Sequence, residues 1–133
     1  MTGLTQADPL QVVRVGDPPF DELFGISPAV RYVAFADGQR VEMRQREGIE
    51  GPSSSESDRF EELLINPALL TLARQRGEID CGGLEFVVVG YGNFRQLVVP
   101  LASGHVSISF ELDADPIDHL GRVRGALEAA RLL

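Results

Sequence analysis

Residues 84–112 read LEFVVVGYGNFRQLVVPLASGHVSISFEL and carry the strongest structural signal in the chain. They contain three short runs rich in β-branched and aromatic residues, which are 84–89, 94–101 and 105–112. A glycine beside an asparagine or a serine separates each run from the next, as is typical of tight turns. Consecutive short strands joined by tight turns pair in antiparallel fashion, so the stretch predicts a three-stranded meander.

The last of these runs, 105–112, alternates between apolar and polar residues. Its apolar members are Val106, Ile108, Phe110 and Leu112, and its polar members are His105, Ser107, Ser109 and Glu111. Because successive side chains of a strand point to opposite faces, the pattern predicts one face on the core and one face in water. We therefore expect His105 on a solvated face or at an interface.

A β-hairpin is predicted upstream of the meander. Residues 30–36 form an apolar run, and Asp37-Gly38, which follows it, is a strong signal for a tight hairpin turn. Residues 41–44 then alternate apolar and charged side chains, as in a strand with one wet face. The two runs are therefore expected to pair with each other.

Three helices are predicted around these strands. Asp17-Pro18-Pro19 combines a capping carboxylate with proline in the first turn, and it predicts a helix of about two turns that stops near Gly25. Apolar residues at three- and four-residue spacing predict a long helix over 58–77. Asp115-Pro116 repeats the same start signal and begins the last helix.

The long helix contains a proline. Asn66-Pro67 interrupts its pattern, because a proline inside a helix removes a backbone hydrogen bond. Either the helix bends at this point, or Asn66 caps a second helix that begins at Pro67. Gly77 is expected to end the element.

The predicted elements follow the order helix, two strands, long helix, three strands and helix, or α-β-β-α-β-β-β-α. This order favours one antiparallel sheet of five strands covered by helices, which places the chain in the α+β class. Residues 17–133 are expected to form a single domain. Residues 1–16 are expected to form an N-terminal extension.

The charge and composition of the chain exclude several classes of function. Its 133 residues include 12 basic and 20 acidic ones, which give a net charge of −8 and a pI near 4.7. Such a field repels nucleic acid and anionic membranes, and no run approaches the ~20 apolar residues of a membrane span. Every basic residue is arginine, which excludes a Schiff-base lysine and a P-loop lysine. We expect a cytoplasmic protein without a nucleic-acid partner, membrane span, cofactor or metal.

The passage from the last strand into the last helix resembles a known family. Residues 113–116, Asp-Ala-Asp-Pro, are followed by Leu-Gly-Arg-Val-Arg at 120–124. This acidic turn and leucine-glycine-x-x-arginine helix, with the element order and the Asp37-Gly38 hairpin, are similar to those of the Roadblock (dynein light-chain) family. The resemblance implies a profilin-like fold, in which one five-stranded antiparallel sheet carries helices on both faces.

Members of the Roadblock family are mostly non-catalytic homodimers that bind small Ras-like GTPases or scaffold motor and signalling complexes. In the bacterial gliding-motility members, the dimer accelerates GTP hydrolysis by repositioning the GTPase's own residues. The resemblance implies that strand 84–89 lies at a sheet edge and pairs with its copy, while the two long helices, 58–77, pack side by side. The implied interface residues are Leu84, Phe86 and Val88 on the strand, and Leu63, Leu64, Leu70 and Arg74 on the helix.

The residues themselves are compatible with such a homodimer. An edge strand as apolar as 86–89 invites aggregation unless it is covered. The helix over 58–77 is apolar around more than a single stripe, so a second face needs a cover. A twofold contact would cover both at once. The alternative is that the strand is central in the sheet and the helix is buried within the monomer.

A second hypothesis is a small-molecule-binding or enzymatic profilin-like domain that uses Cys81, His105 and Glu111. Gly82 and Gly83 would expose the Cys81 thiol, and a thiol nucleophile needs a base such as His105. The simpler interpretation is a small buried cysteine at the entry to a strand. One histidine and one carboxylate are too few ligands to predict a metal site.

Overall fold

The computed structural model describes residues 18–48 and 55–133. The expected extension over residues 1–16 and the Asp17 cap of the first helix lie outside the described residues. The elements in chain order are α2 (Phe20–Phe24), β2 (Val30–Asp37), β3 (Arg40–Gln45), α3 (Ser55–Phe60), the π-helical turn η1 (Glu61–Ile65), α4 (Asn66–Asp80), β4 (Val87–Gly90), β5 (Arg95–Pro100), β6 (His105–Phe110), the 3₁₀ turn η2 (Pro116–His119) and α5 (Leu120–Ala129).

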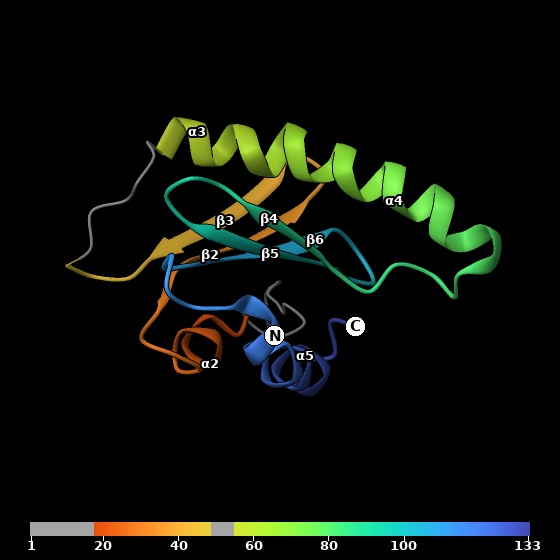
Figure 1. The fold of residues 1–133 in the computed structure, drawn as a ribbon. Helices are drawn as coiled ribbons and strands as arrows, with labels where there is room; N and C mark the ends of the chain where they lie inside the picture. The colour runs from red at the N-terminus through yellow and green to blue at the C-terminus, as the bar shows by residue number, and fades with distance from the viewer. Residues whose placement is uncertain (1–17, 49–54) are drawn as a thin grey trace, which may run out of the picture.

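The five strands form one antiparallel sheet in the order β3-β2-β6-β5-β4. Figure 1 shows that the run from α3 to α4 covers one face of this sheet, and that α2 and α5 cover the other. The α+β class, with five antiparallel strands and helices on both faces, is therefore confirmed. Since β4 lies at one edge of the sheet, the alternative of a central position for this strand is wrong.

The hairpin between β2 and β3 turns on a glycine. Asp37 pairs with Arg40, which leaves Gly38 and Gln39 as the loop. Gly38 has a φ of 63°, a left-handed conformation that glycine adopts without steric cost. A glycine with positive φ at the first loop position is typical of a type II′ turn, so the predicted hairpin is confirmed.

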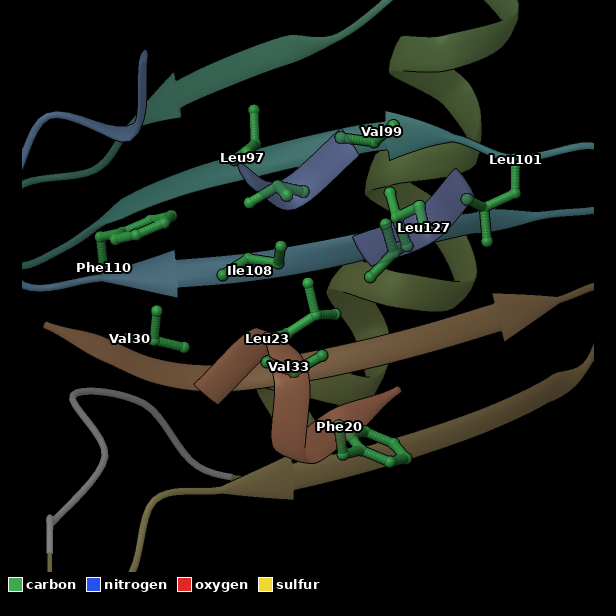
Figure 2. Packing of buried hydrophobic residues seen from close by; sticks show 12 residues of the cluster. Phe20, Leu23, Val30, Val33, Leu97, Val99, Leu101, Ile108, Phe110 and Leu127 are labelled. Carbon is green, nitrogen blue, oxygen red and sulfur yellow. The ribbon is translucent and has the colours of Figure 1, made fainter. Parts of the chain in front are cut away.

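The hydrophobic core lies between the sheet and the two helices α2 and α5. Val106, Ile108 and Phe110 of β6 are completely buried in it. Figure 2 shows Leu23 of α2 and Leu127 of α5 among the packed residues of this cluster. Full burial of one such side chain contributes about 1.5–3 kcal/mol, so this layer supplies the main apolar stabilisation of the fold.

The long helix is continuous through α3, η1 and α4. The N–H of Asn66 donates to the carbonyl of Glu61, five residues earlier, and Asn66 is itself helical. Pro67 cannot donate to the α-helical ladder, and the wider π turn before it accommodates that loss. Of the two alternatives for this point, the cap at Asn66 is therefore wrong, and so is the predicted end at Gly77, since α4 continues to Asp80. No helix among the described residues is long and apolar enough to cross a membrane.

The strand β4 is shorter than its apolar sequence predicts. It begins at Val87, which pairs with Val98, rather than at Leu84. Continued in the same register, Glu85 would lie opposite Pro100, which has no N–H for the ladder. The pairing therefore stops before that position, and residues 84–86 approach the sheet as a loop.

The end of β6 and the start of the last helix also differ in detail from the prediction. β6 ends at Phe110, and Leu112 is 48% exposed. Asp115 caps the helix as predicted, since its side chain accepts the N–H of Ile117 at 3.0 Å. Because the first turn is 3₁₀ rather than α-helical, Ile117 is 48% exposed instead of joining the apolar face of the helix.

Candidate functional site

A buried carboxylate lies between the long helix and the sheet. Glu62, in the π-helical turn, has no solvent exposure, and its Oε2 accepts a hydrogen bond from the Tyr32 hydroxyl at 2.9 Å. Its Oε1 accepts from the Ser107 hydroxyl at 2.6 Å and from Asn66 Nδ2 at 3.1 Å. His105 Nε2 lies 2.7 Å from the same oxygen. Side chains from the helix and from two strands thus converge on one carboxylate.

The burial of His105 corrects the prediction of a solvated histidine. His105 is only 3% exposed, and Ser107 and Ser109 on the same strand are buried as well. The long helix covers this polar face of β6 and turns Glu62 and Asn66 toward it. A hydrogen bond between Glu62 Oε1 and His105 Nε2 needs one proton between the two atoms, which a neutral imidazole supplies when Nε2 is its protonated nitrogen.

The Tyr32 hydroxyl keeps its proton in this cluster. Burial raises the pKa of Tyr32 far above its ordinary value, and the neighbouring Glu62 carboxylate raises it further. The hydroxyl therefore remains a donor to Glu62 throughout the physiological pH range. Asn66 Oδ1 is the one atom of these side chains that is buried without a hydrogen-bond partner among the described residues. The bonds that the cluster does form fix the relative position of the helix and the two strands that carry it.

A hollow of about 180 Å³ opens beside the cluster and is lined by residues of η1 and of the loop between β4 and β5. The Tyr91 hydroxyl donates to the two carboxylate oxygens of Glu61 at 2.9 and 2.8 Å. Burial raises the pKa of Glu61 above its ordinary value, although the hydrogen bond from Tyr91 acts in the opposite direction. Burial and then the bond to Glu61 raise the pKa of Tyr91 to about 12. The folded chain therefore holds an ionised Glu61 at an electrostatic cost.

The wild-type protein is expected to gain stability relative to Glu61→Gln as the pH falls. Because the folded-state pKa of Glu61 lies above its unfolded value, the folded state takes up this proton at a higher pH than the unfolded state. The gain begins as the pH falls through the folded-state pKa and is complete below the unfolded value. Urea unfolding of both proteins from about pH 8 to pH 4 measures it, and a difference that moves the other way contradicts the assignment.

The structure does not bring Cys81, His105 and Glu111 together. Cys81 is exposed at the end of α4, with its sulfur 3.4 Å from Asp80, so the prediction of a buried cysteine is wrong. Glu111 instead accepts two hydrogen bonds from Arg31, at 2.6 and 2.7 Å. His105 contacts neither residue, and no group of three or more metal-ligating side chains occurs in the part of the chain that the structure describes.

The predicted interface residues differ in exposure. Val88 of β4 is 38% exposed, and Leu64 of the long helix is 57% exposed. Four others are half-buried: Leu63, Arg74, Leu84 and Phe86. Leu70 is only 4% exposed and lies inside the chain, where a partner has no access to it.

Three further exposed apolar residues lie on the long helix. Phe60, Leu72 and Ile79 are 54%, 67% and 74% exposed, and with Leu64 they form what we call the apolar stripe. Its members are four, eight and seven residues apart, a spacing that keeps side chains on neighbouring positions of one helix face. The three- and four-residue apolar spacing of this segment predicts a helix that contains these residues. It does not show which apolar face of the helix lies against the sheet and which is exposed to solvent.

No family model matches the chain, and no curated protein matches it. Two solved structures share its fold. One, MglB with a tetrameric arrangement, is 14% identical, with 94% of this chain and 96% of the other covered and a TM-score of 0.67. The other, the gliding protein MglB from Thermus thermophilus, is 12% identical with the same coverage and a TM-score of 0.63. Likeness at these identities shows the fold alone, and it supports the Roadblock-like fold that the sequence implied.

Proposed function

We propose that this chain is a non-catalytic adaptor or regulator that forms a homodimer and acts through protein–protein contacts. The proposed partner class is a small Ras-like GTPase. The sequence resemblance to the Roadblock family supports both parts of the proposal. The two solved structures of similar fold are both MglB, one of them in a tetrameric arrangement, which supports self-association.

The observation that carries the proposal is the apolar stripe of Phe60, Leu64, Leu72 and Ile79. Single exposed apolar residues are normal on a protein surface, but four large ones along one helix form a patch that is typical of interaction sites. The stripe lies on the helix that covers one face of the sheet (Figure 1). Its members are exposed, whereas Glu62 and Asn66 of the same helix are buried and bond to the strands. A second copy of the same helix, related by a twofold axis, would cover it with an identical surface.

The edge strand β4 offers the second half of the proposed interface. Its outer side has no partner among the described strands. The side chain of Val88 on this strand is 38% exposed. Exposed backbone groups of an edge strand form hydrogen bonds readily with another strand. Antiparallel pairing of β4 with its copy would therefore continue the sheet across the twofold axis.

Glutamate substitutions in the two surfaces should separate the proposed homodimer into monomers. We expect wild-type protein to have about twice the mass of the 14.5 kDa chain in light scattering after size exclusion. Leu72→Glu and Val88→Glu should each shift that mass to one chain, because a buried, unpaired carboxylate is costly. Leu133→Glu is the matched control, since Leu133 is 39% exposed, close to the value of Val88, but follows α5 and lies on neither surface.

Two results contradict the homodimer. One is a wild-type protein that stays monomeric across the concentration range. The other is that Leu72→Glu and Val88→Glu both keep the dimer mass, as the control variant Leu133→Glu is expected to do. The GTPase part is tested separately, by titrating the source organism's own Ras-like GTPases, loaded with GDP or a GTP analogue, into the protein; binding by none of them excludes that partner class.

A further inference from the structure

A second exposed apolar area lies at the edge strand β4, on the face of the sheet that α2 and α5 cover. Val88 pairs directly with Leu97, and directly paired residues point to the same face of a sheet. Leu97 belongs to the core between the sheet and these two helices (Figure 2). Val88 therefore extends that apolar layer to the edge of the sheet. The long helix, which carries the apolar stripe, covers the opposite face (Figure 1).

Val88, Leu112 and Pro116 line an open hollow of about 460 Å³, which we call the edge hollow. Leu112 is 48% exposed and occupies the second position of a turn, in which the N–H of Ala114 donates to the carbonyl of Glu111 at 3.0 Å. Such turn positions favour proline and small polar residues. Because the turn does not need a large apolar side chain, folding alone does not account for Leu112. Exposed apolar residues gathered around a hollow are typical of an interaction site.

The charges of the edge hollow are not balanced within the chain. Asp113 and Asp115 contribute to its lining, and neither forms an ion pair among the described residues. Arg95 is the one basic residue of the described lining, and its Nη1 donates to the backbone carbonyls of Tyr91 and Phe94. These bonds hold the guanidinium at the turn between β4 and β5. The edge hollow therefore combines apolar side chains with two carboxylates that can pair with a cation.

We propose that the edge hollow docks a segment of a partner protein in which a large apolar side chain is flanked by arginine or lysine. The apolar side chain contacts Val88 and Leu112, and the basic side chains pair with Asp113 and Asp115. A nucleic acid or an anionic lipid would instead bring its phosphates against these carboxylates. This docking site goes beyond the proposed homodimer and is compatible with it, because side chains contact the partner on the sheet face while strand pairing uses the backbone edge of β4.

The experiment is a titration of the full chain with an acetylated and amidated pentapeptide of the sequence glycine-arginine-phenylalanine-arginine-glycine. ¹H–¹⁵N NMR at the backbone amide of Leu112 follows the binding, and we expect a saturable shift of that signal. A peptide with serine in place of the phenylalanine should bind at least about tenfold more weakly, because it buries no large apolar side chain. A peptide with glutamates in place of the arginines should also bind at least about tenfold more weakly, because it places like charges together.

Variants assign the binding to the edge hollow. Leu112→Ser should weaken binding of the arginine-phenylalanine peptide by about tenfold or more, because it removes an apolar contact. Leu133→Ser is the matched control, since Leu133 is 39% exposed but does not line the hollow, and it should bind like wild type. Asp113→Asn should also weaken binding, whereas Glu78→Gln, at an exposed position of α4, should not.

Four results overturn the docking proposal. They are the absence of a saturable shift, equal binding of the three peptides, wild-type binding by Leu112→Ser, and a lower solution mass of Leu112→Ser than of wild type. The last of these would make the edge hollow a contact between copies of this chain. The peptide comparison uses wild-type protein, so it decides even where a variant does not fold. It reads binding rather than mass, so failure of this proposal and failure of the proposed homodimer are distinguishable.

Discussion

Glu62→Ala is expected to lower the free energy of unfolding by about 3–5 kcal/mol, because several buried donors lose their acceptor at once and each such loss costs about 1–3 kcal/mol. The substitution removes the shared acceptor of Tyr32, Asn66, His105 and Ser107 at once. These groups are buried, so water does not replace the lost acceptor without opening the structure. For a domain with a typical stability of about 5–15 kcal/mol, this is a large fraction of the total.

The control for this prediction is Glu62→Gln, which keeps the shape and one acceptor oxygen. We expect it to cost less than the alanine variant, because only the donors on the replaced oxygen lose their partner. Urea unfolding at equal protein concentration, followed by circular dichroism, measures both variants; equal concentration matters because a homodimer gains stability with concentration. A Glu62→Ala protein within about 1 kcal/mol of wild type would show that the cluster does not stabilise the fold.

Gly104→Ala is expected to cost at least about 3 kcal/mol of unfolding free energy. Gly104 lies in the turn between β5 and β6 with a φ of 79°, a left-handed conformation that an L side chain adopts at a cost of about 1–2 kcal/mol. A Cβ at this position would also lie 1.9 Å from the carbonyl oxygen of Ala36, which is far inside van der Waals contact. Since Ala36 pairs with His105 in the sheet, the clash displaces the ladder between β2 and β6.

Gly38→Ala separates the two contributions to that cost. Gly38 also has a positive φ, 63°, but a Cβ there would meet no atom within 4 Å. This variant should therefore lose only the conformational part, about 1–2 kcal/mol. Urea unfolding of both variants gives the steric part as their difference, and equal losses would contradict the close approach of Gly104 to Ala36.

The polar cluster also determines which face of the long helix is presented to a partner. Glu62, Asn66 and Leu70 recur every four residues and face the sheet, and Leu70 is the one large apolar residue of α4 that is buried. The rotation of the helix therefore depends on directional hydrogen bonds more than on apolar packing. With that rotation fixed, Leu64 and Leu72 face outward, where the proposed homodimer uses them.

The local features of this fold could be predicted from the sequence because local physical chemistry decides them. A glycine that accepts a positive φ placed the β2–β3 hairpin at Gly38. A side-chain oxygen that accepts a free N–H placed a helix start at Asp115. Alternating and three- to four-residue apolar spacings gave the order of strands and helices, and with it the α+β class.

What covers each face was decided only by the tertiary structure. His105 and Ser107 read as residues of a wet strand face, yet they are buried because the helix above them also turns polar residues inward. A polar group that finds its partner on a distant segment is as acceptable in the interior as an apolar one, so hydrophobic periodicity does not reveal its burial. Cys81 shows the converse. A free cysteine beside a strand is usually buried, but α4 continues past Gly77 to Asp80, and the thiol of Cys81 at its end is exposed to solvent. Periodicity along the chain specifies which elements form, whereas burial depends on contacts between elements that are far apart in the sequence.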